Sequence, residues 1–255
     1  MESLSQSEKL FITRNTSFSE LSDANIADFR KTHELDVIRD STIDYTKYQK
    51  LKRVDDQKYL HENLKSVEFD PLFDQPVILP KELRILHTEF KFNQPLELPE
   101  TLEKITFGYE YNQAARLPAG LQRVHFGYKF NQAMELPAGL KQVYFGYKFN
   151  QAVELPAGLL VVEFGHDYNR STELPDSLIY FTSGYSFNQP LKLPPALGSV
   201  YLGYKFNQPI LFPETIKCIT LGYRFNHKVL VPESAVHLVY NIDILQQNGN
   251  WLIRR

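Results

Sequence analysis

The sequence has little cysteine and no long apolar run, and both shortages limit the kinds of protein it encodes. Its one cysteine, Cys218, cannot form an internal disulfide, whereas extracellular chains with many loops often carry several. No stretch approaches the roughly 18 consecutive apolar residues of a membrane span. Residues 1–20 also lack the basic start and apolar run of a secretion signal. We therefore expect an intracellular protein without a membrane span.

The chain also lacks an excess of positive charge. Its formal net charge is −2 and its pI is about 6.4. Proteins that bind DNA or RNA non-specifically need a basic face to neutralise phosphates, so we expect no nucleic-acid partner. No Gly-rich phosphate loop, Cys-His cluster or Ser-His-Asp order stands out either. We predict no catalytic residue, no metal site and no cofactor.

What the sequence does contain is a repeat. The unit at residues 117–135, LPAGLQRVHFGYKFNQAME, differs from its successor at only four positions. A fixed period near 20 residues is typical of a solenoid, in which each unit contacts only its neighbours. An asparagine recurs every 19 residues, and Asp74 extends this register one step back; the asparagine column is Asn93, Asn112, Asn131, Asn150, Asn169, Asn188, Asn207 and Asn226.

The apolar columns of the repeat predict short strands. In Val124-His125-Phe126, for example, the two apolar residues are two positions apart, so they point inward while His125 points outward. Nineteen residues leave no room for a strand, two turns and a helix, and the Leu-Pro pair that opens each unit favours an extended return path. We predict a mainly β fold: a leucine-rich-repeat-like parallel β-solenoid of about nine 19-residue coils.

Two polar or small columns have structural interpretations. Stacked asparagine side chains can bond backbone groups left free at a turn, or can bond one another in an asparagine ladder. A glycine column that includes Gly127 and Gly146 indicates a special backbone angle or a close approach of two backbones where each strand ends. We therefore expect both columns to hold the coils together.

The sequence motif of the coils resembles that of a known family. The segments FGYKFNQA at residues 145–152 and GYKFNQPI at residues 203–210 are similar to FNIP repeats, leucine-rich-repeat relatives of social amoebae and of giant viruses of amoebae. The resemblance covers about residues 60–230, although the period is shorter than the family's usual one. The Leu-Pro-Ala-Gly-Leu segment also resembles short leucine-rich repeats of bacterial effectors. Both resemblances imply a protein-binding scaffold and not an enzyme, located in the host cytoplasm if the chain is viral.

The two ends depart from the period. We assign residues 1–59, with a predicted helix at residues 19–35, to an N-terminal cap or adaptor segment, residues 60–230 to the repeats and residues 231–255 to a C-terminal cap. The FNIP resemblance implies an alternative: a diverged F-box in residues 1–59 would make the chain a substrate receptor for a ubiquitin ligase. The usual leucine-proline opening of an F-box is missing there. Imperfect caps would instead allow copies to associate through the solenoid ends.

Two surfaces are candidates for binding a protein partner, whose identity the sequence leaves open. Outward strand positions are free of core duty, and their aromatic and arginine side chains are typical of interface hot spots; the alternative is an ordinary solvated sheet face. A second column follows the glycines and either forms an exposed ridge or only stabilises the turns by stacking. The candidates are Arg123, His125, Gln142, Tyr144, Glu163, Tyr180 and Tyr201 on the sheet, and Tyr109, Tyr128, Tyr147 and Tyr204 on the ridge.

Charged residues six positions apart have opposite signs, as in Glu110 with Arg116, Lys129 with Glu135 and Lys148 with Glu154. We expect these pairs to meet across the turn of their own coil.

A carbohydrate-active β-solenoid is the remaining alternative. Glu135, Glu154 and Glu173 recur one coil apart, which is about one strand spacing and close to the separation of a retaining glycosidase's carboxylates. They lie on a turn beside lysines, with no aromatic subsite predicted. A deep groove lined by paired carboxylates would favour this alternative, and a flat sheet would not.

Overall fold

The computed structural model describes residues 48–51, 60, 64–235, 237–239 and 252–254. The chain divides into two units, Met1–Asp40 and Ser41–Arg255, and every described residue belongs to the second. The predicted helix at residues 19–35 lies outside the described residues, as does most of the predicted C-terminal cap. The proposed boundaries at residues 59 and 231 remain predictions.

The described part of the chain contains short strands and no helix, so none of its elements is a membrane-spanning helix. The strands are β1 (Tyr48–Leu51), β2 (Ser66–Phe69), β3 (Ile85–Thr88), β4 (Lys104–Phe107), β5 (Arg123–His125), β6 (Gln142–Tyr144), β7 (Val161–Glu163), β8 (Tyr180–Thr182), β9 (Ser199–Tyr201), β10 (Cys218–Thr220), β11 (Val229–Val231), β12 (His237–Val239) and β13 (Leu252–Arg254).

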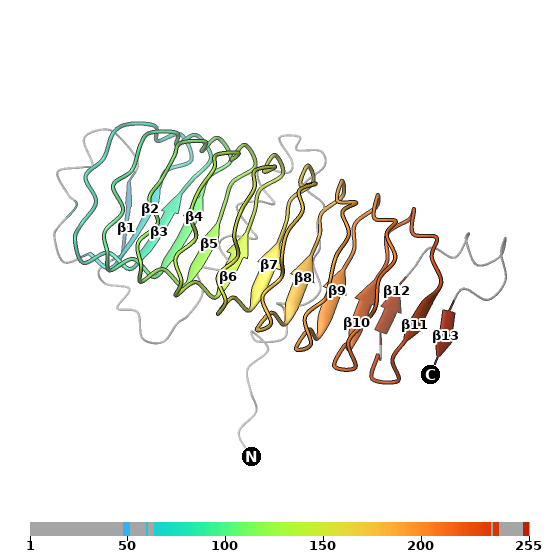
Figure 1. Cartoon of the computed structure of the whole chain (residues 1–255). Coiled ribbons are helices and arrows are strands. Elements are labelled where there is room, and N and C mark those ends of the chain that lie inside the picture. The colour runs from blue at the N-terminus through green and yellow to red at the C-terminus, as the bar shows by residue number, and fades with distance from the viewer. Residues whose placement is uncertain (1–47, 52–59, 61–63, 236, 240–251, 255) are drawn as a thin grey trace, which may run out of the picture. The chain divides into compact units, whose positions relative to one another are not determined.

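Eleven of these strands form one parallel sheet in the order β1 to β10 followed by β12, while β11 and β13 pair in a second sheet (Figure 1). Each strand from β3 to β10 is in register with the residue 19 positions earlier, as Val124 is with Ile105. A parallel sheet with this constant offset is a β-solenoid. The predicted leucine-rich-repeat-like solenoid is therefore confirmed, with about eight turns where the sequence indicated about nine.

The core consists of the inward columns, which stack along the solenoid. Val124 is fully buried, whereas its neighbours Arg123 and His125 are half-buried on the other side of the sheet. Aromatic residues at the end of each coil stack one above another, with ring centroids 6.2 Å apart for Phe130 and Phe149. Each coil thus buries its apolar face against two neighbours, as the strand alternation predicted.

Two short turns close each coil without a helix. The Leu121 N–H donates to the Pro118 carbonyl oxygen (3.1 Å), and the Phe130 N–H donates to the Gly127 carbonyl oxygen (3.2 Å). A Cβ atom on Gly127 would lie 1.7 Å from the Gly108 carbonyl oxygen, so close backbone approach explains the glycine column. Among the described glycines only Gly184 has a positive φ, of 63°, so a special angle is required at that one coil.

Candidate interaction surfaces

The sheet face is the set of outward side chains on β2 to β10 and β12. Parallel register places the candidates on five adjacent strands, β5 to β9. His125 is beside Tyr144, and Tyr144 is beside Glu163. The next two members of this row are Thr182 and Tyr201. The structure therefore brings all seven sheet candidates onto one surface.

At β5 and β6 the sheet face is aromatic. The His125 and Tyr144 rings stack with their centroids 3.9 Å apart and their planes 13° apart. The Tyr144 hydroxyl donates to Oε1 of Gln142 at 3.4 Å. These half-buried contacts fix the side chains before any partner binds.

At β7 and β8 the sheet face is partly desolvated. Burial raises the pKa of Glu163 to about 6, and the Tyr180 hydroxyl opposes that rise. Burial also raises the pKa of Tyr180. Thr182 belongs to the same outward row but is only 9% exposed, so its position is not solvated. Its hydroxyl is buried and interacts with the Tyr180 side chain, which partly offsets the rise in the pKa of Tyr180.

The tyrosine ridge is a continuous aromatic stack. Neighbouring ring centroids lie 4.2 to 5.3 Å apart along the column Phe90, Tyr109, Tyr128, Tyr147, His166, Tyr185, Tyr204 and Tyr223. Burial, followed by the neighbouring Tyr128, raises the pKa of Tyr109 and of Tyr147. The ring faces contact each other, so the faces of the inner members are covered by their neighbours.

The ion pairs differ from the expectation of contacts within a coil. Lys129 pairs with Glu110 at 2.6 Å, and Lys148 pairs with Asp167 at 3.2 Å. Hydrogen bonding to these carboxylates raises the pKa of both lysines. Arg116 approaches Glu100 at 3.9 Å. The prediction that these residues pair six positions apart is wrong, because the coil stacking brings charges of neighbouring coils closer together.

Within the asparagine column the hydrogen bonds run from backbone to side chain. Each asparagine N–H donates to Oδ1 of the column member one coil earlier, at 2.8 to 3.1 Å, beginning with Asp74 as the acceptor for Asn93. The side chains are half-buried or exposed and do not form part of the core. Every coil from Asn93 onward is thereby tied to its predecessor.

The residue after each asparagine adds a second tie, which the sequence reasoning missed. The Gln113 amide donates to the Asn93 carbonyl oxygen at 3.0 Å, and Gln132, Gln151, Gln189 and Gln208 repeat this contact. Arg170 replaces glutamine but its Nε–H donates to the Asn150 carbonyl oxygen at 3.1 Å. The residue after each of these asparagines is a glutamine or an arginine, and both carry a side-chain N–H donor. This shared donor is the sequence signal that could have revealed the column.

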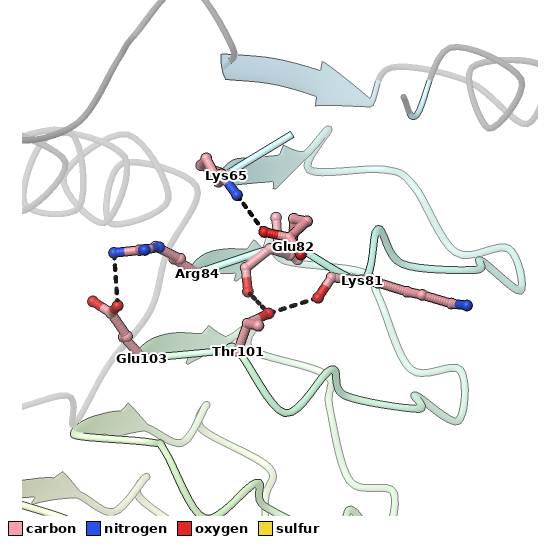
Figure 2. A network of polar contacts seen from close by, with 7 residues as sticks. Lys65, Lys81, Glu82, Arg84, Thr101 and Glu103 are labelled. Carbon is pink, nitrogen blue, oxygen red and sulfur yellow. Dashed lines mark hydrogen bonds and ion pairs between the residues drawn. The ribbon is translucent and has the colours of Figure 1, made fainter. Parts of the chain in front are cut away.

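A third tie uses hydroxyl groups. Figure 2 shows Thr101 between coils, where its hydroxyl donates toward the carbonyl oxygens of Lys81 (2.7 Å) and Leu83 (2.8 Å). Ion pairs from Arg84 to Glu103 and from Lys65 to Glu82 flank it. The residues with equivalent hydroxyl bonds are Ser177, Thr215 and Ser234. Serine or threonine recurs at this position in four of the coils, and this recurrence could have revealed the column from sequence.

The glutamates considered for a carbohydrate-active site lie on the surface of the solenoid. Glu135, Glu154 and Glu173 are all exposed. Within the described residues, histidine, cysteine, aspartate and glutamate side chains nowhere gather in threes to hold a metal ion.

Comparisons with known proteins agree with this geometry. Residues 92–129 match the model of the FNIP repeat. The resemblance seen in the sequence is confirmed. Among solved structures the chain is similar to CroV588, a circular leucine-rich-repeat protein from a giant virus, with 30% identity and a TM-score of 0.58. The match covers 70% of this chain and 34% of CroV588, so the chain spans about a third of that protein. No curated protein matches the chain.

Proposed function

We propose that the chain is an intracellular, non-catalytic scaffold that binds another protein through its sheet face. The fold supports this role, because FNIP and leucine-rich-repeat solenoids are consistent with protein-interaction scaffolds. The fold alone does not identify the binding surface, since a solenoid has several exposed faces.

The observation that carries the choice of surface is the contrast between the sheet face and the columns that build the frame. The asparagine column is unchanged from Asn93 to Asn226 and the glycine column from Gly108 to Gly222, and the core columns are apolar apart from Thr88 and Ser183. The outward row of β5 to β9 instead changes from His125 to Tyr144, Glu163, Thr182 and Tyr201. A rigid frame with a different side chain at each step can recognise a specific partner at little ordering cost.

The tyrosine ridge is a weaker candidate. It presents nearly the same group at each coil, and the ring faces that would contribute most to a contact are stacked on one another, as Tyr128 and Tyr147 are at 4.6 Å. Its geometry therefore favours stabilisation of the turns over recognition of a partner.

Affinity capture from a cell lysate tests the proposal. The full chain is compared with a sheet variant in which Arg123, Tyr144, Tyr180 and Tyr201 are changed to alanine. A ridge variant with Tyr109, Tyr128, Tyr147 and Tyr204 changed to phenylalanine serves as the control. Quantitative mass spectrometry should show proteins that the ridge variant retains and the sheet variant loses, because truncating hot-spot residues weakens binding strongly.

Three other outcomes separate the alternatives. Loss of the same proteins with the ridge variant alone would move the binding site to the ridge. Proteins retained equally by all three chains would contradict the choice of the sheet face. A ubiquitin-ligase subunit that the sheet variant still retains would favour the F-box hypothesis for residues 1–59.

A further inference from the structure

The proposed sheet-face function is sharpened by one charged group. In β6 to β10, all of which the structure describes, Glu163 carries the single charge on the outward side. The other outward residues of these strands are Gln142, Tyr144, Val161, Tyr180, Thr182, Ser199, Tyr201, Cys218 and Thr220. A lone carboxylate within a neutral surface gives this region a defined negative potential.

This carboxylate is poorly solvated and has no ion pair with a described residue. Glu163 is half-buried, and burial raises its pKa to about 6. At pH 7 the group is therefore mostly ionised although water compensates its charge incompletely. A cation that approached it would restore the lost stabilisation, and the attraction would be stronger than on an exposed surface.

The neighbours of Glu163 suit a planar cation. Tyr180 lies on the next strand, and Tyr201 is beside Thr182 one strand further. Tyrosine rings attract cations over their faces, and the same molecule already places Lys148 5.1 Å from the centroid of the Tyr147 ring.

We propose that Glu163, Tyr180 and Tyr201 form an arginine-recognition site, here called the Glu163 patch, that receives a guanidinium group of the protein partner. Guanidinium combines five donors with a planar face that stacks on aromatic rings, so it can bond a carboxylate while contacting tyrosine. Lysine can supply only a compact charge, so we expect it to bind the patch less tightly. This inference rests on the proposed function, because it needs the partner to lie on the sheet face.

The test uses the full chain and a phage-displayed library of random peptides as the probe. Peptides selected on the wild-type chain should share an arginine. Their synthetic versions are then measured by fluorescence anisotropy against the wild type and Glu163→Gln, with the shared arginine kept, changed to lysine or changed to its neutral analogue citrulline. The citrulline peptide keeps the experiment decisive even if a protein variant is less stable, since it leaves the protein unchanged.

We expect Glu163→Gln and arginine-to-citrulline each to weaken binding about tenfold, as removal of one partner of a charge-assisted pair does. The two changes together should weaken it hardly more than either alone. Wild-type affinity should fall as the pH drops from 7 to 5 and Glu163 becomes protonated, whereas Glu163→Gln should show no such change.

A second variant separates this inference from the proposed function. Arg123→Ala with Tyr144→Ala alters the sheet face outside the Glu163 patch. If binding needs Arg123 and Tyr144 but is unchanged by Glu163→Gln, the arginine site is wrong and the sheet face stands. Peptides that bind independently of both variants, or a library that yields no binder, would contradict both proposals.

Discussion

The coils that contain Val124 and Phe181 fill the same core with opposite arrangements of size. In the first coil a small Val124 is followed by a large Phe126, whose ring stacks on Phe145 with centroids 5.5 Å apart and planes at 10°. In the second, a large Phe181 is followed by a small Ser183, and Phe181 meets Phe164 edge-on at 72°. Both coils leave their inward residues fully or nearly fully buried.

This comparison shows what the repeat conserves. Exchange of a large and a small residue within one coil is tolerated because Phe181 offsets part of the volume that Ser183 lacks. The polar Ser183 is tolerated because its hydroxyl accepts the Gly203 N–H at 2.9 Å, and Thr88 does the same for Gly108 at 3.0 Å. Filled volume and satisfied hydrogen bonds therefore define the core more closely than residue identity does.

The largest effect should come from the backbone contact that both kinds of coil share. A Cβ atom would lie 1.8 Å from the Gly127 carbonyl oxygen at Gly146, and 2.0 Å from the Gly165 carbonyl oxygen at Gly184. We expect Gly146→Ala and Gly184→Ala each to destabilise the fold by more than about 4 kcal/mol in chemical denaturation. Gly139→Ala, whose Cβ would be 3.1 Å from its nearest atom, is the control. Equal stability of all three would contradict the close-approach explanation.

Two substitutions can reverse the exchange of a large and a small core residue at positions 181 and 183. Ser183→Phe alone should destabilise the fold by about 3 kcal/mol, because it overpacks a core that already holds Phe181 and removes the acceptor of the Gly203 N–H. Adding Phe181→Val restores the arrangement of the regular coil and should recover part of the loss. Chemical denaturation of the two single variants and the double variant gives the coupling free energy between positions 181 and 183. Strictly additive effects would show that the two positions do not compensate each other.

The Glu163 carboxylate should make the diverged coil sensitive to pH. Its pKa is raised from 4.5 to about 6 in the folded chain, so ionisation opposes folding: stability is lost as the pH rises through this interval and is fully present below 4.5. The free energy of unfolding of Glu163→Gln, relative to that of the wild type, should therefore increase by up to about 2 kcal/mol between pH 4 and pH 7.5. Unfolding free energies at the two pH values measure this gain. An identical difference at both would mean that the carboxyl is not desolvated.

The smallest effect concerns a bond that the diverged coil has and the regular coil lacks. Ser177 donates toward the Ala157 and Leu159 carbonyl oxygens at 2.7 and 2.6 Å, while Gly139 occupies the same position two coils earlier. Gly139→Ser should stabilise the fold by about 1 kcal/mol through a new hydrogen bond and a less flexible unfolded chain. Gly139→Ala separates the two contributions, and a serine variant no more stable than alanine would refute the hydrogen bond.

Much of the fold was predictable because every strand repeats a local pattern at one period. Val124 and Phe126 fixed which side of the strand faces inward, and the period fixed which strands are adjacent. The ion pairs were not predictable in this way, because a charge 19 residues away, such as Glu110 for Lys129, lies nearer than one in the same coil. The exchange of a large and a small residue at Phe181 and Ser183 was not predictable either. Each residue belongs to a different column, and in its own column it resembles a random substitution.

The candidate surfaces show the same division. The period was enough to place Tyr144, Glu163 and Tyr201 in one row on the sheet, with Thr182 of β8 between the last two. The desolvation of Glu163 and the burial of Thr182 depend on how surrounding side chains cover them, which no column of the sequence records. Whether the seven sheet residues bind a partner stays a prediction.

The hydrogen bonds of the asparagine and glutamine columns require a fixed number of residues in each coil. Asn131 bonds the residue 19 positions earlier and Gln132 bonds the residue 20 positions earlier, so an insertion or deletion of one residue would misplace both contacts at its coil. Removal of residues 117–135 as a block would instead bring equivalent partners together again. The hydrogen bonds between coils are therefore compatible with a longer or shorter array only when whole 19-residue units are added or removed.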